Sequence, residues 1–132
     1  MDASVAVAWC FQDEATAFTE GMLDLLAKST TALVPALWLL ELSNALLSAE
    51  RKKRLTVAQS TAFLQRVAGL PISIDATPLA PTCNQILSVA RLHELTTYDA
   101  AYLELALRNN LPLATLDEAL RRSAKTAGVR LL

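Results

Sequence analysis

Short apolar runs separated by whole helical patterns constrain this fold more than any other feature of the sequence. Four such runs are bounded by Pro or Gly and are typical of strands, at residues 32–35, 71–75, 112–115 and 129–132. Helical periodicity fills the intervals, at about residues 4–12, 15–28, 37–52, 57–68, 80–94, 99–109 and 118–127. Because strands separated by helices cannot form hairpins, we expect them to lie parallel, with helices on both faces. The pattern predicts a small three-layer α/β/α sandwich with a short parallel central sheet and about seven helices.

Length and composition indicate one folded domain, residues 1–132. The chain is 53% hydrophobic and contains only 3 glycines and 5 prolines, which is unlike the composition of disordered segments. Its 132 residues can bury a sizeable core but are few for two domains. The sequence shows no repeat, linker or low-complexity segment that would divide it.

The longest apolar stretch argues against a membrane protein. It covers residues 32–47, but Pro35, Glu41 and Asn44 interrupt it, and it is shorter than the roughly 20 residues of a membrane span. The acid at position 2 occupies a place where a signal peptide carries positive charge. These features predict a protein that stays in the cytoplasm, away from the membrane.

Charge and cysteine content argue against a protein with a strongly basic surface for nucleic acid and against one stabilised by disulfides or zinc. The formal net charge of −1 gives no general electrostatic attraction for nucleic acid, so a nucleic-acid partner would have to be held locally. Cys10 and Cys83 are too few for a disulfide framework or a zinc site, and they fit a reducing compartment.

Most of the thirteen acids occupy ordinary positions on exposed helix faces. Glu104 is one of these, and its spacing predicts a favourable i, i+4 pair with Arg108. Asp99, at the start of a helical pattern, and Asp117, just after a predicted strand, also suit helix caps. For these two acids a capping role and a chemical role both remain open.

Glu41 is harder to assign to an exposed face. It interrupts a helix that is apolar nearly all round, and with Asn44 and Ser48 it forms one narrow polar stripe at i, i+3 and i+7 spacing. Such a stripe faces either water or a polar pocket. The residues alone leave both alternatives open.

The order of the elements brings four acids toward one edge of the predicted sheet. In a parallel α/β sheet, ligands bind beyond the carboxyl ends of the strands, where Glu41, Asp99 and Asp117 are expected. Asp2 would join them if a first strand preceded it. Clustered carboxylates raise one another's pKa and need cations among them, and oxygen ligands of this kind suit Mg²⁺ or Mn²⁺. Such ions activate water, so the predicted chemistry is metal-dependent phosphodiester hydrolysis.

Four motifs in their order and spacing resemble the PIN-domain family, and within it the VapC-type ribonuclease toxins of prokaryotic toxin–antitoxin pairs. They are DASVAVAW at residues 2–9, ELSNALL at 41–47, TTYDAAYLELA at 96–106 and PLATLDEALRRSAKTAGV at 112–129. The resemblance covers nearly the whole chain and implies a PIN-like sandwich. It implies a catalytic Mg²⁺ or Mn²⁺ site formed by four acids: Asp2, Glu41, Asp99 and Asp117. Hydrogen bonds that orient these carboxylates are implied for three further residues: Ser4, Asn44 and Thr115.

The same resemblance implies an endoribonuclease that cuts single-stranded or looped RNA, with water as the nucleophile and 5′-phosphate and 3′-hydroxyl products. It further implies a homodimer and a VapB-like antitoxin that blocks the acidic site. The helical patterns at residues 17–27 and 58–67 are candidate surfaces for that partner. A basic run beyond the Glu41 helix offers candidates for contact with RNA phosphates, or simply a charged helix end: Arg51, Lys52, Lys53 and Arg54.

The N-terminus departs from the family pattern. Family members have a hydrophobic first strand that ends at the first aspartate, whereas only Met1 precedes Asp2 here. We therefore expect the first strand to be truncated or missing before Asp2. The alternative to a nuclease is a catalytically inactive PIN-like protein-interaction module, in which Asp2 is too loosely held for catalysis.

Overall fold

The computed structural model describes residues 1–28, 30–77 and 79–132. Seven helices and two strands occupy these residues, in a small α/β fold as the sequence predicts. In chain order they are α1 (Ala3–Ala8), α2 (Ala17–Ala27), β1 (Ala32–Val34), α3 (Leu37–Arg51), α4 (Val57–Ala68), β2 (Ile72–Ile74), α5 (Leu79–His93), α6 (Thr97–Arg108) and α7 (Glu118–Thr126).

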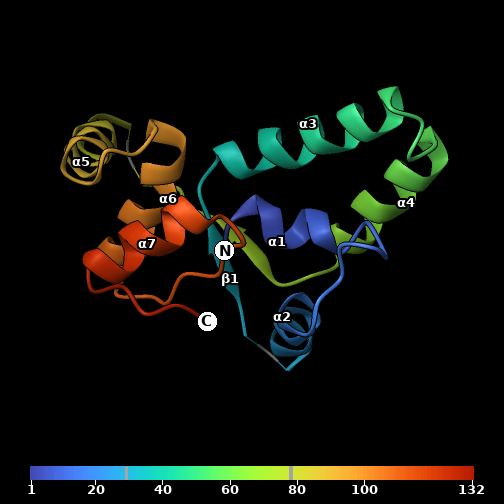
Figure 1. The fold of residues 1–132 in the computed structure, drawn as a ribbon, viewed down its shortest axis with the longest axis horizontal. Coiled ribbons are helices and arrows are strands. Elements are labelled where there is room, and N and C mark those ends of the chain that lie inside the picture. The colour runs from blue at the N-terminus through green and yellow to red at the C-terminus, as the bar shows by residue number, and fades with distance from the viewer. Residues whose placement is uncertain (29, 78) are drawn as a thin grey trace.

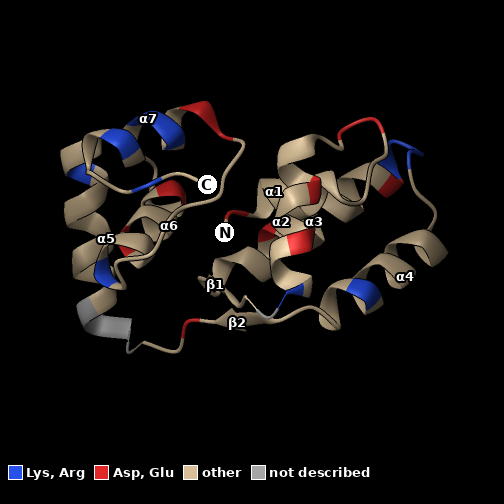
Figure 2. Cartoon of the chain, turned by 90° about the horizontal axis from the view of Figure 1, so that it is seen from below, with Lys and Arg blue, Asp and Glu red and all other residues tan. Residues whose placement is uncertain are grey.

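The sheet lies between two groups of helices. Helices α1 to α4 gather on one side of it and α5 to α7 on the other, as both views of the chain show (Figures 1 and 2). Strands β1 and β2 pair in parallel, with Ala32 opposite Ile72 and Val34 opposite Ile74. Because the strands run in the same direction, their carboxyl ends meet at one edge of the sheet, near the start of α3.

The two later strand-like runs shorten to a single parallel bridge between Leu113 and Leu131. Two backbone hydrogen bonds form it: Leu113 N–H to the Arg130 carbonyl at 2.9 Å, and Leu132 N–H to the Leu113 carbonyl at 3.1 Å. Pro112 has no N–H to donate, which limits extension of a ladder at this point. Residues 112–115 nevertheless follow an ordered course through the core, because Leu113, Ala114 and Thr115 are all buried.

Local signals explain where several helices begin and end. The predicted capping box at the start of α4 is present: Thr56 N–H donates to Gln59 Oε1 at 2.8 Å and Gln59 N–H to Thr56 Oγ1 at 3.2 Å. Helix α1 ends at Ala8, four residues before the predicted end. The chain turns there, and the Trp9 indole donates to the Thr19 carbonyl at 2.8 Å, which ties the turn to α2.

Helix α6 is the central helix of the molecule. Residues 100–106 of it are all buried, among them Leu103, which has no exposed surface. The prediction that Glu104 lies on an exposed face is wrong, because this residue is only 4% exposed. The predicted pair with Arg108 is present at 2.7 Å and offsets the cost of burying the carboxylate. Among the described residues, none of the helices is long and apolar enough to cross a membrane.

Candidate active site

Asp2 lies at the carboxyl end of β1, between that strand and residues 112–114. Its N–H donates to the Ala114 carbonyl at 2.8 Å, and the amine of Met1 donates to the Leu33 carbonyl at 3.1 Å. These two bonds hold the first two residues between segments that are far apart in sequence. Asp2 is then the N-cap of α1 and is 7% exposed. The backbone therefore fixes where this carboxylate can point.

Two hydroxyl groups orient the Asp2 side chain. Ser4 Oγ and Thr115 Oγ1 each donate to Asp2 Oδ2 at 2.6 Å. The hydroxyls are themselves held: Leu116 N–H donates to Ser4 Oγ at 3.1 Å and Asp117 N–H to Thr115 Oγ1 at 3.0 Å. Asp2 Oδ1 accepts only a long contact from the Ser4 N–H, at 3.4 Å, among the described residues. One oxygen of Asp2 is thus committed to the protein and the other is left for a ligand.

Glu41 lies in the second turn of α3 and faces the protein rather than open water. The Tyr102 hydroxyl, from α6, donates to Glu41 Oε2. Burial raises the pKa of Glu41, the hydrogen bond from Tyr102 lowers it, and the charges of Asp2 and Asp99 raise it further, so the net direction is upward. Glu41 therefore occupies a site that favours an added positive charge.

Asp99 lies in the first turn of α6, next to the N-cap residue Thr96. Thr96 Oγ1 accepts from the Asp99 N–H at 3.1 Å and donates to Asp99 Oδ2 at 2.7 Å. The capping interaction predicted from the sequence is therefore present. It does not exclude a second role, because the charge of Asp99 also raises the pKa of Glu41 across the site.

Asp117 caps α7 from an exposed position. Its Oδ1 accepts from the Leu120 N–H at 2.7 Å, and its own N–H bonds to Thr115, which in turn holds Asp2. The charges that raise the pKa of Glu41 are those of Asp2 and Asp99. Asp2 and Asp99 thus act on the pKa of Glu41, whereas Asp117 is connected to the site through Thr115, which bonds to Asp2.

The donor set suits a hard divalent cation. In the part of the chain that the structure describes, no three acidic, His or Cys side chains gather tightly enough to form one metal-binding cluster. Mg²⁺, however, usually keeps several waters and takes only one or two protein carboxylates. Asp2 and Asp99 each have one oxygen engaged by a hydroxyl, and Glu41 has one engaged by Tyr102. Oxygen atoms of this kind are the ligands that Mg²⁺ and Mn²⁺ prefer.

The other predicted residues lie farther out. Asn44 is exposed on α3, and no hydrogen bond among the described residues joins it to the four acids. The basic run begins ten residues after Glu41, about 15 Å along α3. Arg54 pairs with Asp13 at 3.1 Å and with Glu14 at 2.9 Å, so two acids already partly neutralise its charge.

Comparison with protein families identifies the chain. The model of the PIN domain matches residues 1–126. The chain belongs to the PIN-domain family. Among solved structures it is similar to PAE2754 from Pyrobaculum aerophilum, with 25% sequence identity and a TM-score of 0.69, over 92% of this chain and 76% of that one. Comparison with curated proteins gave no match. PIN domains are generally metal-dependent nucleases, and the chain has this nuclease-type fold.

Two residues of this PIN domain contribute to the site without having been predicted. Tyr102 is bonded to Glu41, and Arg121 Nη1 donates to the Thr115 carbonyl at 3.0 Å, which places a partly exposed guanidinium beside the acids. The spacing in the sequence could have pointed to both residues. Tyr102 is three residues after Asp99 and Arg121 is four after Asp117, so each lies on the same helix face as its acid. An aromatic residue in a buried helix and a base in an exposed one are too common to single out from spacing alone.

Proposed function

We propose that this PIN domain is a Mg²⁺- or Mn²⁺-dependent endoribonuclease of the VapC toxin type, acting at Asp2, Glu41, Asp99 and Asp117. One observation carries the proposal. Glu41 is half-buried, its pKa is raised by burial and by two neighbouring acids, and no Lys or Arg among the described residues forms an ion pair with any of the four. A stable fold does not need such a group, whereas a metal-dependent nuclease does.

The roles of the protein groups follow from their contacts. A bound Mg²⁺ or Mn²⁺ would supply an activated water and neutralise charge on the phosphodiester. Asp2, Glu41 and Asp99 would hold the ion, with Asp117 at the outer edge. Ser4 and Thr115 fix the direction of Asp2, and Tyr102 holds one oxygen of Glu41. Attack by water on the phosphorus leaves a 5′-phosphate and a 3′-hydroxyl.

Basic side chains near the acids supply candidate contacts to RNA phosphates. Arg121 donates to the Thr115 carbonyl, next to Asp2 and Asp117, and Arg122 and Lys125 follow it in α7, whose ribbon is blue at its basic positions in Figure 2. Arg51, Lys52 and Lys53 are exposed at the far end of α3 and extend the candidate path. Phosphate contacts give affinity without sequence preference, so these residues would set the strength of RNA binding.

Partners follow from the toxin assignment: a VapB-like antitoxin and a second copy of the chain. Exposed apolar side chains on the helices predicted for this role support the proposal, with Leu25 on α2 and Val57 and Leu64 on α4. An amphipathic antitoxin helix would pack against such a face. Affinity purification from the native host is expected to recover a small partner; its absence would count against this part of the proposal.

Cleavage of a panel of structured and unstructured RNAs tests the nuclease. We expect cutting with Mn²⁺ or Mg²⁺ that is lost in EDTA and in Asp99→Asn, and retained in the matched variant Glu94→Gln, an exposed acid near the same helix. Folding of each variant is checked by circular dichroism. If the folded wild type cuts no RNA and binds Mn²⁺ no better than Asp99→Asn does, the nuclease proposal fails and the inactive interaction module is favoured.

A further inference from the structure

The aromatic side chains of the protein differ sharply in their exposure. The chain has three Phe, two Trp and two Tyr, and all seven belong to the residues that the structure describes. Six of them are buried or half-buried: Trp9, Phe11, Phe18, Trp38, Phe63 and Tyr102. Tyr98 is 65% exposed. Its ring is therefore the one broad aromatic face that the described part of the chain offers to a ligand.

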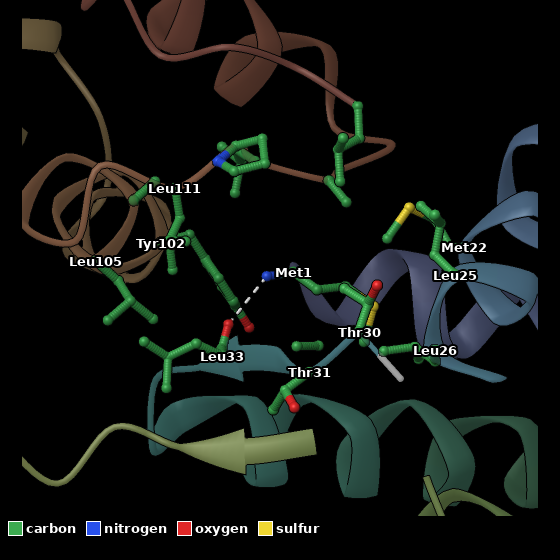
Figure 3. A pocket seen from close by; sticks show the side chains of 16 residues that line it. Met1, Met22, Leu25, Leu26, Thr30, Thr31, Leu33, Tyr102, Leu105 and Leu111 are labelled. Atoms are coloured by element: carbon green, nitrogen blue, oxygen red, sulfur yellow. Dashed lines mark hydrogen bonds between the residues drawn. The ribbon is translucent and has the colours of Figure 1, made fainter. Parts of the chain in front are cut away.

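Tyr98 lies beside the acidic site. It immediately precedes Asp99 in the first turn of α6, and Tyr102, four residues further on, lies on the same helix face. The Tyr102 hydroxyl donates to Glu41, and Figure 3 shows the Tyr102 side chain pointing from α6 toward Met1, the neighbour of Asp2. This face of α6 is thus directed toward the acids. Tyr98 is its exposed end, about 6 Å along the helix axis from Tyr102.

The structure gives Tyr98 no other task. Among the described residues its hydroxyl forms no hydrogen bond, and the N-cap of α6 is Thr96, which bonds to Asp99. Tyr102, by contrast, is 2% exposed and has its hydroxyl engaged by Glu41. One tyrosine of this helix face supports the acids, and the other presents its ring to the solvent in front of them.

A second exposed apolar side chain borders the acids from another segment. Leu116 lies between Thr115 and Asp117 and is 39% exposed. Its N–H donates to Ser4 Oγ at 3.1 Å, and Ser4 in turn bonds to Asp2. The edge of the site thus combines carboxylates with apolar side chains from two parts of the chain.

A nucleotide carries groups that match this combination. Its phosphate would bind at the acids through a metal ion, whereas an unstacked base has a flat face that stacks on aromatic side chains. The Cα atoms of adjacent residues such as Tyr98 and Asp99 are about 3.8 Å apart, so one nucleotide can reach both side chains. A base that is stacked within a duplex cannot offer its face in this way.

We infer that Tyr98 is a specificity-determining residue, whose ring stacks on the unpaired base of a nucleotide next to the scissile phosphate. The inference rests on the proposed function, because it needs RNA at the acidic site, and it adds the feature of the RNA that is recognised. Every base has a flat face, so the stacking requires an unpaired base but accepts all four. Cleavage is then restricted to positions where that base is free.

RNAs that lack a single base test the inference. A single-stranded RNA that the wild type cuts is prepared with one abasic nucleotide at each position around the cleaved bond in turn. We expect one position next to that bond at which the missing base raises KM about 10–100-fold, the usual effect of losing one stacked base, with kcat nearly unchanged. Tyr98→Ala should raise KM as much on intact RNA and show no further loss on that abasic RNA. Losses that multiply would overturn the inference.

Conservative variants separate the ring from the rest of the side chain. Tyr98→Phe keeps the ring and should stay within about threefold of the wild-type KM, whereas Tyr98→Leu keeps apolar bulk and should resemble Tyr98→Ala. Leu92→Ala removes a side chain that is 77% exposed on α5 and should leave KM unchanged. A loss in Tyr98→Phe as large as in Tyr98→Ala would overturn the inference, and so would an equal loss in Leu92→Ala.

Binding measured apart from cleavage separates this inference from the proposed nuclease. With Ca²⁺ in place of Mn²⁺, fluorescence anisotropy of a labelled single-stranded RNA gives the Kd of the wild type and of Tyr98→Ala. Weaker binding by Tyr98→Ala would support the stacking even if the wild type cuts no RNA with Mn²⁺. Metal-dependent cleavage and RNA binding that are both unchanged in Tyr98→Ala would overturn the stacking and leave the nuclease in place.

Light scattering tests whether Tyr98 belongs to a protein interface instead. The inference predicts the same molecular mass for the wild type and for Tyr98→Ala. A changed mass together with unchanged RNA binding would place Tyr98 between copies of the chain and overturn the inference.

Discussion

Two groups of acids lie near the carboxyl ends of the parallel strands, and they differ in whether a cation accompanies them. Beyond β2, Asp75 and Glu104 share Arg108, with 2.7 Å between the guanidinium and each carboxylate. Thr77 adds a hydroxyl that bonds to both Asp75 and Arg108, at 2.8 Å each. Beyond β1, the carboxylates of Asp2, Glu41 and Asp99 accept from hydroxyl groups and from one backbone N–H, and no Lys or Arg among the described residues pairs with them.

The pKa directions of the two groups are opposite. Burial would raise the pKa of Asp75, but hydrogen bonds from Arg108 and Thr77 outweigh it and lower that pKa. The hydrogen bonds that Arg108 donates to Glu104 and Asp75 raise the pKa of Arg108. The pKa of Glu41 is raised instead. Where an arginine pairs with buried acids, the protein itself neutralises their charge. Where no arginine pairs with them, their negative charge can be neutralised by a bound cation.

The largest expected effect is on the rate of RNA cleavage, which should depend on the acids beyond β1 but not on those beyond β2. Asp2→Asn should reduce the proposed metal-dependent RNA cleavage by about 100-fold or more, because it would remove one of the proposed charged metal ligands. Asp75→Asn should leave the cleavage rate within about threefold, since its partner is Arg108. Single-turnover cleavage at saturating Mn²⁺ measures both. Equal losses in the two variants would contradict the division.

Removing Arg108 should destabilise the fold, because Asp75 and Glu104 lose their shared cation. Arg108→Met leaves Asp75 and Glu104 together without a cation, and is expected to cost about 3 kcal/mol in the free energy of unfolding. This is the low end for buried pairs, because the Arg108 side chain is 23% exposed. Urea unfolding measures the change. The double variant Arg108→Met with Glu104→Gln should recover part of the lost free energy of unfolding. If it recovers none, Arg108 does not stabilise the fold by neutralising Glu104.

A matched pair of hydroxyls sharpens the comparison further. Thr115→Val removes the donor to Asp2 and should lower cleavage by about 10–100-fold, the usual effect of losing a group that orients a metal ligand. Thr77→Val removes the corresponding hydroxyl beside Asp75 and should leave cleavage unchanged while lowering Tm. Cleavage rates and thermal melts of both variants show whether each hydroxyl serves activity or stability. The pair would fail as a test if Thr77→Val lost as much activity as Thr115→Val.

The smallest expected effect is a difference in how stability depends on pH, measured without metal. Because the folded pKa of Glu41 is raised, its ionisation opposes folding, and stability falls as the pH rises from about 4.3 through the raised value. Glu41→Gln should remove this fall. The folded pKa of Asp75 is lowered, so its contribution is present above about 3.9 and is lost as the pH falls further. Asp75→Asn should remove that loss, and urea unfolding across pH checks both signs.

The sequence could nominate candidate acids, but it could not predict their surroundings. Order and spacing predicted Asp2, Glu41, Asp99 and Asp117 because each follows or precedes a recognisable element. The same reasoning put Glu104 on an exposed face, since its pairing with Arg108 is typical of a wet helix. Its second contact comes through Arg108 to Asp75, across 33 residues. Helix periodicity carries no information about such a distant partner.

The sequence by itself determined the alternation of helices with short strands, the capping of α4, α6 and α7, and the PIN-domain family. These are local properties, set by residues within one turn or one strand of each other. Tertiary structure alone decided that Tyr102 bonds to Glu41, that Thr115 holds Asp2 from 113 residues away, and that Arg108 neutralises one group of acids and not the other. The physical reason is that burial and Coulomb interactions depend on distance in space, which only the packed chain defines.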